Sequence, residues 1–156
     1  MGAGQYGQLA KEIAICTHKY NDIAFLDDKF EDAVGPFIDW RKFNDDFFVA
    51  IGDSALRSEW IQRLIVAGKR IATLVHPQSY ISSSARVGKG SIVEPFVAIN
   101  TGASIGTSVF LCAGSVINHN AIVGSYCQID AGAIVASRSI VPEKTKVYSG
   151  TVWQEN

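Results

Sequence analysis

Cysteine, methionine and histidine are scarce in this 156-residue sequence, and each scarcity excludes a class of protein. The cysteines, Cys16, Cys112 and Cys127, are scattered, so they form neither a disulfide framework nor a C-x-x-C metal pair, and they favour a reducing, cytoplasmic location. The single methionine excludes a Met-rich recognition surface. With three histidines in all, we expect no metal centre built from several imidazoles.

Long apolar runs and an excess of one charge are also lacking. No apolar run reaches the length of a membrane span, and the N-terminus lacks the charged-then-apolar pattern of a secretory signal. The net charge of −1 comes with no basic stripe, which argues against nucleic acid as the main partner. A composition of 47% hydrophobic and 19% charged residues is typical of a globular chain.

The two halves of the chain differ in composition. Residues 1–78 hold 20 of the 29 charged residues, whereas residues 79–156 are rich in Ile, Val, Ala, Ser and Gly. A shift of this size marks a domain boundary, and the His-Pro-Gln-Ser stretch at 76–79 is the natural place for it. We therefore expect two domains, residues 1–78 and 79–156.

The first half has the pattern of a small α/β unit. A continuous apolar run, DFFVAIGD at 46–53, predicts a central parallel strand. The other predicted elements are a helix from Gly4 to before Asn21, a strand at 22–26, a turn with a short strand at 35–40, a helix capped by Ser54 and ended by Gly68, and a strand at 70–77. In parallel sheets, ligands bind at the carboxyl ends of strands, where the polar residues after 26 and 51 fall.

The chain opens on MGAGQYG, which fits G-x-G-x-x-G with Gly2, Gly4 and Gly7. This fingerprint turns a strand into a helix so that backbone N–H groups meet a phosphate, but by itself it is a weak signal. Only Met1 precedes the loop here. We expect the first strand, which would lie between the two predicted strands at 22–26 and 46–51, to be missing, and the natural chain to start several residues upstream.

The second half is an uninterrupted six-residue repeat. From Ile81 to Val147 every sixth residue is Ile, Val or Leu, and the residue four further on is small or β-branched. This period predicts a β-solenoid, which we call the prism, with one hexad per flat side and three per coil. Twelve hexads make four coils, about 19 Å tall at about 4.8 Å per coil. We expect the aliphatic residues on the axis, and the next residue (Gly88, Asn100) at corners with unusual backbone angles.

His119 is the one histidine of the prism. An exposed histidine alone carries little weight, but this half has few titratable groups, and His119 is the one able to move a proton near pH 7. It follows the aliphatic Ile117 by two residues, which predicts a place near a corner. The flat sides of the prism predict packing against sister chains in a cyclic homo-oligomer, most simply a trimer.

Together, GAGQYG, FLDD, FVAIGD, LVHP and the hexapeptides with VINHN resemble the NeuD/PglD family of sugar O- and N-acyltransferases over nearly the whole chain. The resemblance implies a Rossmann-like domain joined to a left-handed β-helix in a homotrimer. It also implies transfer of an acetyl group from acetyl-CoA to a sugar, often a nucleotide-linked amino sugar used for surface glycans.

The resemblance further implies roles for individual residues. His119 would be the catalytic base, with Asn120 beside it. The nucleotide sugar would bind Gly2, Gly4, Gly7, Asp27, Asp28, Gly52 and Asp53. Acetyl-CoA would lie along the prism between two subunits, at Gln128, Gly132, Ala136 and Ser137.

Four departures from the family pattern keep a second interpretation open. Asn120 replaces a carboxylate that would orient the histidine, Gln128 replaces a second histidine, and Gln5-Tyr6 replace Gly-His in the loop. The chain also ends soon after the twelfth hexad, which leaves less surface for coenzyme A. The alternative is a non-catalytic protein that binds a nucleotide sugar or a partner enzyme. A β-helix carbonic anhydrase would need several histidines on the prism.

Overall fold

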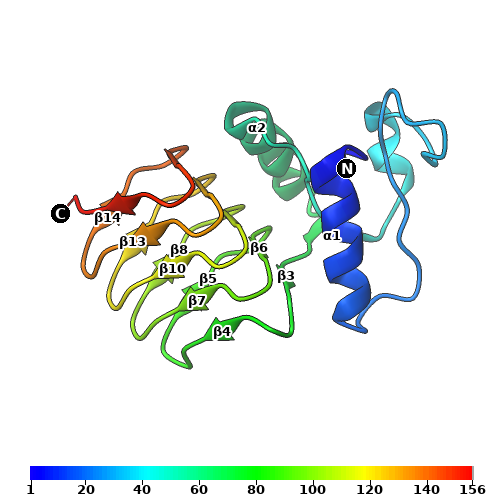
Figure 1. The fold of residues 1–156 in the computed structure, drawn as a ribbon. Coiled ribbons are helices and arrows are strands. Elements are labelled where there is room, and N and C mark those ends of the chain that lie inside the picture. The colour runs from blue at the N-terminus through cyan, green and yellow to red at the C-terminus, as the bar shows by residue number, and fades with distance from the viewer. Residues whose placement is uncertain (156) are drawn as a thin grey trace.

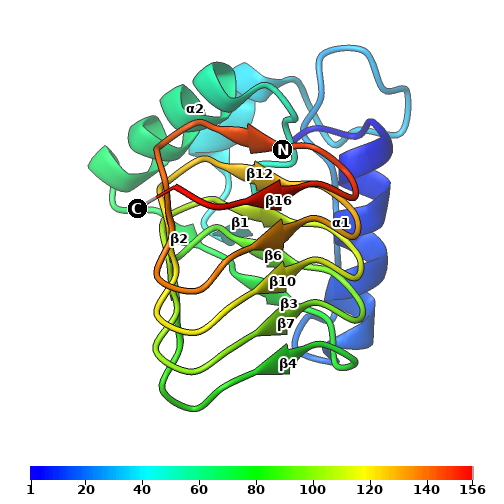
Figure 2. The same cartoon turned by 60° about the vertical axis from the view of Figure 1, so that its left-hand side comes forward.

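A computed structural model describes residues 1–155, which form an N-terminal unit followed by a stack of coils (Figure 1). The N-terminal unit contains α1 (Gln5–Cys16), the 3₁₀ helix η1 (Phe37–Lys42), β1 (Asp46–Phe47), α2 (Ser54–Val66) and β2 (Arg70–Ile71). These helices lie beside the coils in both views (Figures 1 and 2). In the part of the chain that is described, no helix is long and apolar enough to cross a membrane.

The coils consist of two-residue strands that pair in parallel. These strands are β3 (Leu74–Val75), β4 (Tyr80–Ile81), β5 (Arg86–Val87), β6 (Ile92–Val93), β7 (Ala98–Ile99), β8 (Ser104–Ile105), β9 (Phe110–Leu111), β10 (Val116–Ile117), β11 (Ile122–Val123), β12 (Gln128–Ile129), β13 (Ile134–Val135), β14 (Ile140–Val141), β15 (Lys146–Val147) and β16 (Val152–Trp153).

Three parallel sheets form the sides of the prism. Their strand orders are β16-β13-β10-β7-β4, β14-β11-β8-β5 and β15-β12-β9-β6-β3, which we call face 1, face 2 and face 3. Successive strands along the chain fall on successive faces, so three strands complete one coil. The predicted solenoid of about four coils is therefore confirmed.

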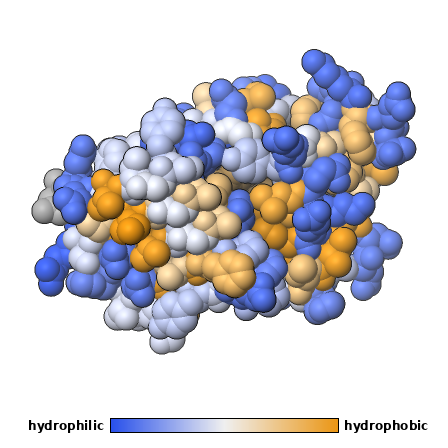
Figure 3. All heavy atoms as spheres, viewed as in Figure 1, coloured by the Kyte–Doolittle hydropathy of each residue, from blue (hydrophilic) through white to orange (hydrophobic). Residues whose placement is uncertain are grey.

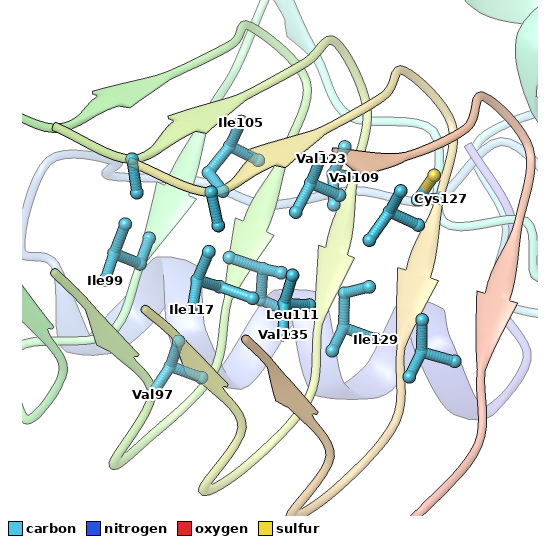
Figure 4. Close-up of a cluster of buried hydrophobic side chains, with 14 of the residues drawn as sticks. Val97, Ile99, Ile105, Val109, Leu111, Ile117, Val123, Cys127, Ile129 and Val135 are labelled. Carbon is cyan, nitrogen blue, oxygen red and sulfur yellow. The ribbon is translucent and has the colours of Figure 1, made fainter. Parts of the chain in front are cut away.

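The aliphatic positions of the repeat fill the axis of the prism, as predicted (Figure 4). Ten of them expose 3% or less of their surface: Val93, Ile99, Ile105, Leu111, Ile117, Val123, Ile129, Val135, Val141 and Val147. Burying each such side chain contributes about 1.5–3 kcal/mol. Ile81 and Val87, in the first coil, are only partly buried.

The corners of the prism correct one detail of the sequence interpretation. Left-handed backbone angles fall two residues later than predicted, at positions such as Gly102 (φ 71°) and Asn120 (φ 57°). The glycines directly after aliphatic residues instead allow neighbouring coils to pack closely, because they have no side chain. A Cβ on Gly88 would collide with the Gly106 carbonyl, and a Cβ on Gly106 would lie 2.6 Å from Ser125 N. The requirement at these positions is steric rather than conformational.

Both α-helices form where the sequence predicts them. α1 begins directly after Gly4, as predicted, and ends at Cys16, earlier than the predicted end before Asn21. The N-cap of α2 is Asp53 rather than the predicted Ser54, because the Asp53 carboxylate accepts a hydrogen bond from Leu56 N (2.7 Å). Gly68 follows the end of α2 with φ 69°, a left-handed angle that commonly ends a helix.

The predicted strands of the N-terminal unit are only partly formed. The strand expected at 22–26 is wrong, since the segment makes a single bridge, Leu26 with Gly35. The short strand expected at 35–40 is replaced by the start of η1. An apolar run predicts burial correctly, but a strand also needs a neighbour within hydrogen-bonding distance along its length. The Rossmann-like sheet is therefore only partly present.

The two later strands of this unit are also shorter than expected. The run at 46–51 contributes β1 alone, which pairs in parallel with β2. The run at 70–77 divides into β2 and β3, and β3 pairs with β6 in face 3. The prism thus begins before residue 78, directly out of the small sheet.

Met1 and Gly2 lie between the segments around Leu26 and Phe48. The Met1 ammonium donates to the Phe48 carbonyl (2.7 Å), Ala50 N donates to the Met1 carbonyl (2.8 Å), and Gly2 N donates to the Leu26 carbonyl (2.9 Å). Burial lowers the pKa of the Met1 amine to about 6. A cavity of about 560 Å³ continues from this point between residues 20–26 and 45–48.

Arg57 joins the N-terminal unit to the prism. It is fully buried, and its guanidinium donates to the carbonyls of Ile51 (2.7 Å), Gly52 (2.8 Å) and Tyr126 (2.6 Å). The same group lies 4.2 Å from the centre of the Phe110 ring. Burial lowers the pKa of Arg57 to about 10, so it stays charged at neutral pH.

Candidate functional site

The glycine loop at the start of α1 is shaped by two of its three glycines. Gly2 has φ 94°, and a Cβ on Gly7 would collide with the Gly2 carbonyl, so both positions require glycine. A Cβ on Gly4 would meet nothing within 4 Å. Gly4 is the N-cap of α1, and no side chain caps the start of the helix, an arrangement that suits an anion.

Asp27 is bound to this loop. Its carboxylate accepts hydrogen bonds from Ala3 N (2.9 Å), Lys29 N (2.9 Å) and Phe30 N (3.2 Å). The bond from Ala3, followed by the other backbone bonds, lowers the pKa of Asp27. Asp28 accepts from Phe37 N (2.9 Å). Asp27 therefore holds the glycine loop in shape, whereas Asp28 holds the start of η1.

The second loop, at Gly52 and Asp53, lies beside the glycine loop. A Cβ on Gly52 would lie 3.3 Å from the ring of Tyr6, the second residue of α1. Asp53 uses one carboxylate oxygen to cap α2. The structure thus brings together the two loops that the sequence assigned to the nucleotide sugar.

Tyr6 connects the glycine loop to face 3 of the prism. Gln128 Nε2 donates to the Tyr6 hydroxyl oxygen (2.7 Å) and to Asp130 Oδ1 (2.6 Å), and Asp130 forms an ion pair with Lys146 (3.3 Å). The Tyr6 ring packs 5.1 Å from that of Phe110. Burial, with the nearby acidic groups, raises the pKa of Tyr6 to about 12, so its hydroxyl is neutral at physiological pH.

Two more titratable groups border this contact. Glu94, on face 3, is buried and accepts a hydrogen bond from Ala113 N (2.9 Å), and burial raises its pKa. Burial also raises the pKa of the Cys112 thiol to about 12. Sequence reasoning assigned no role to Tyr6, Glu94 or Cys112. The one available signal was the replacement of Gly-His by Gln-Tyr in the loop.

His119 lies at the corner between face 1 and face 2, two residues after Ile117, whose side chain is on the axis. Its side chain is exposed, and its Nδ1 lies 3.1 Å from the hydroxyl oxygen of Ser137, one coil further along. Ala136, beside Ser137, is at the same corner. Gly132 lies at the other end of β13, at the corner between face 3 and face 1.

Apart from Gly132, the predicted residues therefore fall into two groups in one chain. The glycine loop, Gly52 and Gln128 lie together at face 3. His119, Asn120 and Ser137 lie at the corner between face 1 and face 2, which in a triangular coil is opposite face 3. The corner offers a base, and the loops offer N–H groups suited to an anion. Within residues 1–155 no three His, Cys, Asp or Glu side chains gather as a metal site.

Comparison with known proteins matches residues 1–64 to the PglD N-terminal domain. A curated relative, UDP-N-acetylbacillosamine N-acetyltransferase of Bacillus subtilis (strain 168), is 29% identical over 105 residues. The match covers 60% of this chain and 49% of the relative, so the matched region spans about half the length of that protein.

Two solved structures share the fold. The acetyltransferase domain of PglB from Neisseria gonorrhoeae FA1090, in complex with acetyl coenzyme A, superposes with a TM-score of 0.95 at 23% identity, covering 99% of this chain and 80% of that one. The second is a histidine-to-asparagine mutant of perosamine N-acetyltransferase from Caulobacter crescentus, in complex with CoA and GDP-perosamine. It superposes with a TM-score of 0.81 at 23% identity, covering 99% of this chain and 87% of that one.

Proposed function

We propose that this chain, a member of the NeuD/PglD family of sugar acyltransferases, transfers an acetyl group from acetyl-CoA to an amine or hydroxyl of a nucleotide-linked sugar. The observation that carries the proposal is His119, the one imidazole in residues 79–155, exposed at a corner with its Nδ1 beside a hydroxyl. The relatives support the proposal. One is named UDP-N-acetylbacillosamine N-acetyltransferase, and the two solved structures are complexes with acetyl coenzyme A and with CoA and GDP-perosamine.

In this reaction His119 acts as general base. The acceptor nitrogen or oxygen attacks the thioester carbonyl of acetyl-CoA while the imidazole takes up its proton. The C–S bond then breaks, and the proton passes to the departing sulfur to give free CoA. No charge is left on the enzyme, so one imidazole suffices for the whole proton transfer. Asn120 carries no negative charge to stabilise the imidazolium.

The nucleotide part of the acceptor would bind at the two loops of the N-terminal unit. Open space at Gly4 and the uncapped first turn of α1 suit a phosphate. Gly52 borders the same space through its contact with Tyr6. In this proposal Asp27 shapes the glycine loop, Asp28 fixes the start of η1, and Asp53 fixes the start of α2.

A second copy of the chain would unite the two groups of residues. The His119 corner and the glycine loop lie on opposite sides of the prism, so a base from one subunit would meet the loop of another. Ile122 and Ile140, exposed apolar side chains on face 2, lie next to the His119 corner and offer a surface for such packing. Figure 3 shows hydrophobic residues, in orange, gathered on the surface of the coils. We propose a homotrimer of left-handed prisms, with acetyl-CoA between subunits along residues 128–137.

The alternative is a binding protein without catalysis. It is favoured by Asn120, whose side-chain oxygen lies over Gly102 rather than at the His119 ring. Titration calorimetry with acetyl-CoA separates the two functions, because a scaffold that binds only a nucleotide sugar or a partner enzyme gives no heat. The cytoplasmic location stays a prediction.

The proposed function is tested by removing the base. His119→Asn lowers turnover of acetyl-CoA with UDP- and GDP-linked amino sugars by about 10²- to 10⁴-fold, the usual contribution of a general base. The measurement is release of free CoA, and His18→Asn, at another exposed histidine, is the control that keeps activity. Equal turnover in parent and His119→Asn would exclude the mechanism.

A further inference from the structure

Ser137 is held against the His119 ring by the stacking of two coils. Its hydroxyl oxygen lies 3.1 Å from His119 Nδ1. The two residues occupy equivalent corner positions in consecutive coils, 18 residues apart. Backbone hydrogen bonds fix this register, since Arg138 N donates to the His119 carbonyl (3.1 Å) and Asn118 N to that of Val135 (3.0 Å). The hydroxyl is thus placed by the fold rather than by a flexible loop.

Asn120, the expected partner of the ring, is turned away from it. Its backbone is left-handed, with φ 57°. A Cβ on Gly102 would collide with Asn120 Oδ1, so the amide covers the coil on the other side of His119 from Ser137. Among the described residues, Ser137 alone makes a hydrogen bond to the His119 ring.

We propose that Ser137 is the positioning residue of His119, an inference that rests on the proposed function. Its hydroxyl oxygen accepts the hydrogen of Nδ1, which leaves the lone pair on Nε2. In this form Nε2 is the nitrogen that takes up the acceptor's proton. When the ring becomes an imidazolium, the same bond becomes charge-assisted and strengthens, so it favours the protonated product of the transfer.

This role differs from contact with acetyl-CoA, which the sequence implied for Ser137. A residue that only bound acetyl-CoA would change its KM when altered. A positioning residue changes kcat and the proton distribution on the ring. The neutral hydroxyl bond is worth about 1 kcal/mol, so its loss corresponds to a five- to tenfold effect.

The first test reads the ring itself and needs no substrate. In protein labelled with ¹⁵N-histidine, long-range ¹H–¹⁵N spectra above pH 8 report which nitrogen of His119 carries the hydrogen, with His119→Asn assigning the signals. We expect the Nδ1–H form in the parent and in Ser137→Thr, and a shift toward Nε2–H in Ser137→Ala. The control is Ser83→Ala, which leaves the spectrum unchanged because Ser83 is exposed at the same corner but lies two coils from His119. An unchanged tautomer in Ser137→Ala overturns the proposal.

The second test uses turnover. Ser137→Ala lowers kcat five- to tenfold with little change in the KM of acetyl-CoA, and Ser137→Thr restores kcat. A raised KM at constant kcat would instead make Ser137 a binding residue and reject the positioning role. If the parent turns over no acceptor, the proposed function fails, while the tautomer spectra still decide whether Ser137 orients the ring.

Discussion

The prism and the N-terminal unit reach their structures by different means. In the prism, each coil repeats the contacts of the one before, with an aliphatic side chain on the axis and a parallel strand pair on each face. In the N-terminal unit, strands β1 and β2 pair over two residues, and single contacts from Arg57, Asp27 and Met1 hold the loops. A repeat spreads its stability over many equivalent contacts, whereas the N-terminal unit combines two buried apolar clusters with a few polar contacts that have no equivalent elsewhere in the chain.

The same difference applies to the two parts of the proposed site, the base and the acceptor-binding loops. The prism places His119 with backbone hydrogen bonds that every coil makes. The N-terminal unit places its two loops, at residues 1–7 and 52–53, with a buried guanidinium and a carboxylate. Changes in the prism should therefore act locally on the proposed base, while changes in the N-terminal unit should act on the whole proposed acceptor site.

Arg57→Met tests the dependence on single contacts and has the largest expected effect. Several buried carbonyl oxygens lose their donor, each at a cost of about 1–3 kcal/mol, so we expect a loss of about 4 kcal/mol. The loss should fall on the N-terminal unit, because the prism keeps its own strand pairing. Hydrogen exchange read by mass spectrometry should rise in residues 1–72 far more than in 92–147.

Arg63→Met is the matched control for this change. Arg63 lies on the same helix but is exposed, and its partner is Glu59 in a surface ion pair. We expect a change within about 0.5 kcal/mol. If hydrogen exchange in Arg57→Met rises equally in residues 1–72 and 92–147, the contrast between the N-terminal unit and the prism is wrong, since the prism would then depend on the same guanidinium.

Glycine substitutions in the prism sharpen the comparison from the other side. Gly106→Ala places a Cβ 2.6 Å from the backbone N of Ser125, and such overpacking costs about 2–3 kcal/mol. Gly114→Ala meets nothing within 4 Å but must hold φ near 69°, which costs about 1 kcal/mol. Urea denaturation should rank the two in this order. The reverse order would mean that backbone angle, not coil contact, sets the demand for glycine.

The axis and the strands of the prism could be predicted from the sequence because each depends on spacing alone. All twelve aliphatic positions fall in strands, as the period requires. The N-terminal strands could not, because a run such as 22–26 predicts burial but does not reveal whether a neighbouring strand exists. Arg57 was also missed, since a charge on a helix normally faces solvent, and its partners lie up to 70 residues away.

The candidate site was predictable in its parts but not in its arrangement. Spacing placed His119 at a corner, and the loop motif placed the glycines at the start of a helix. The hydrogen bond between His119 and Ser137 depends on which side chains meet when the coils stack. The contact of Tyr6 with Gln128 depends on how the N-terminal unit packs against the prism. The family pattern places a carboxylate directly after the histidine, at the position of Asn120, whereas the side chain that contacts the His119 ring comes from the next coil.

Asp27→Asn has the smallest expected effect and depends on pH. The folded state lowers the pKa of Asp27, mainly through the bond from Ala3 N, so its ionised form stabilises the loop. That stabilisation is present above the unfolded pKa of about 3.9 and is lost as the pH falls through the lower folded value. After allowance for solvent screening, we expect the variant to be about 1 kcal/mol less stable at pH 7. Urea denaturation at pH 7, 5, 4 and 3 should show the gap closing as the parent's own carboxylate protonates, whereas Asp32→Asn, exposed on the same loop, should follow the parent throughout. A gap that stays constant down to pH 3 would contradict the charge-dependent role and leave Asp27 as a purely steric part of the loop.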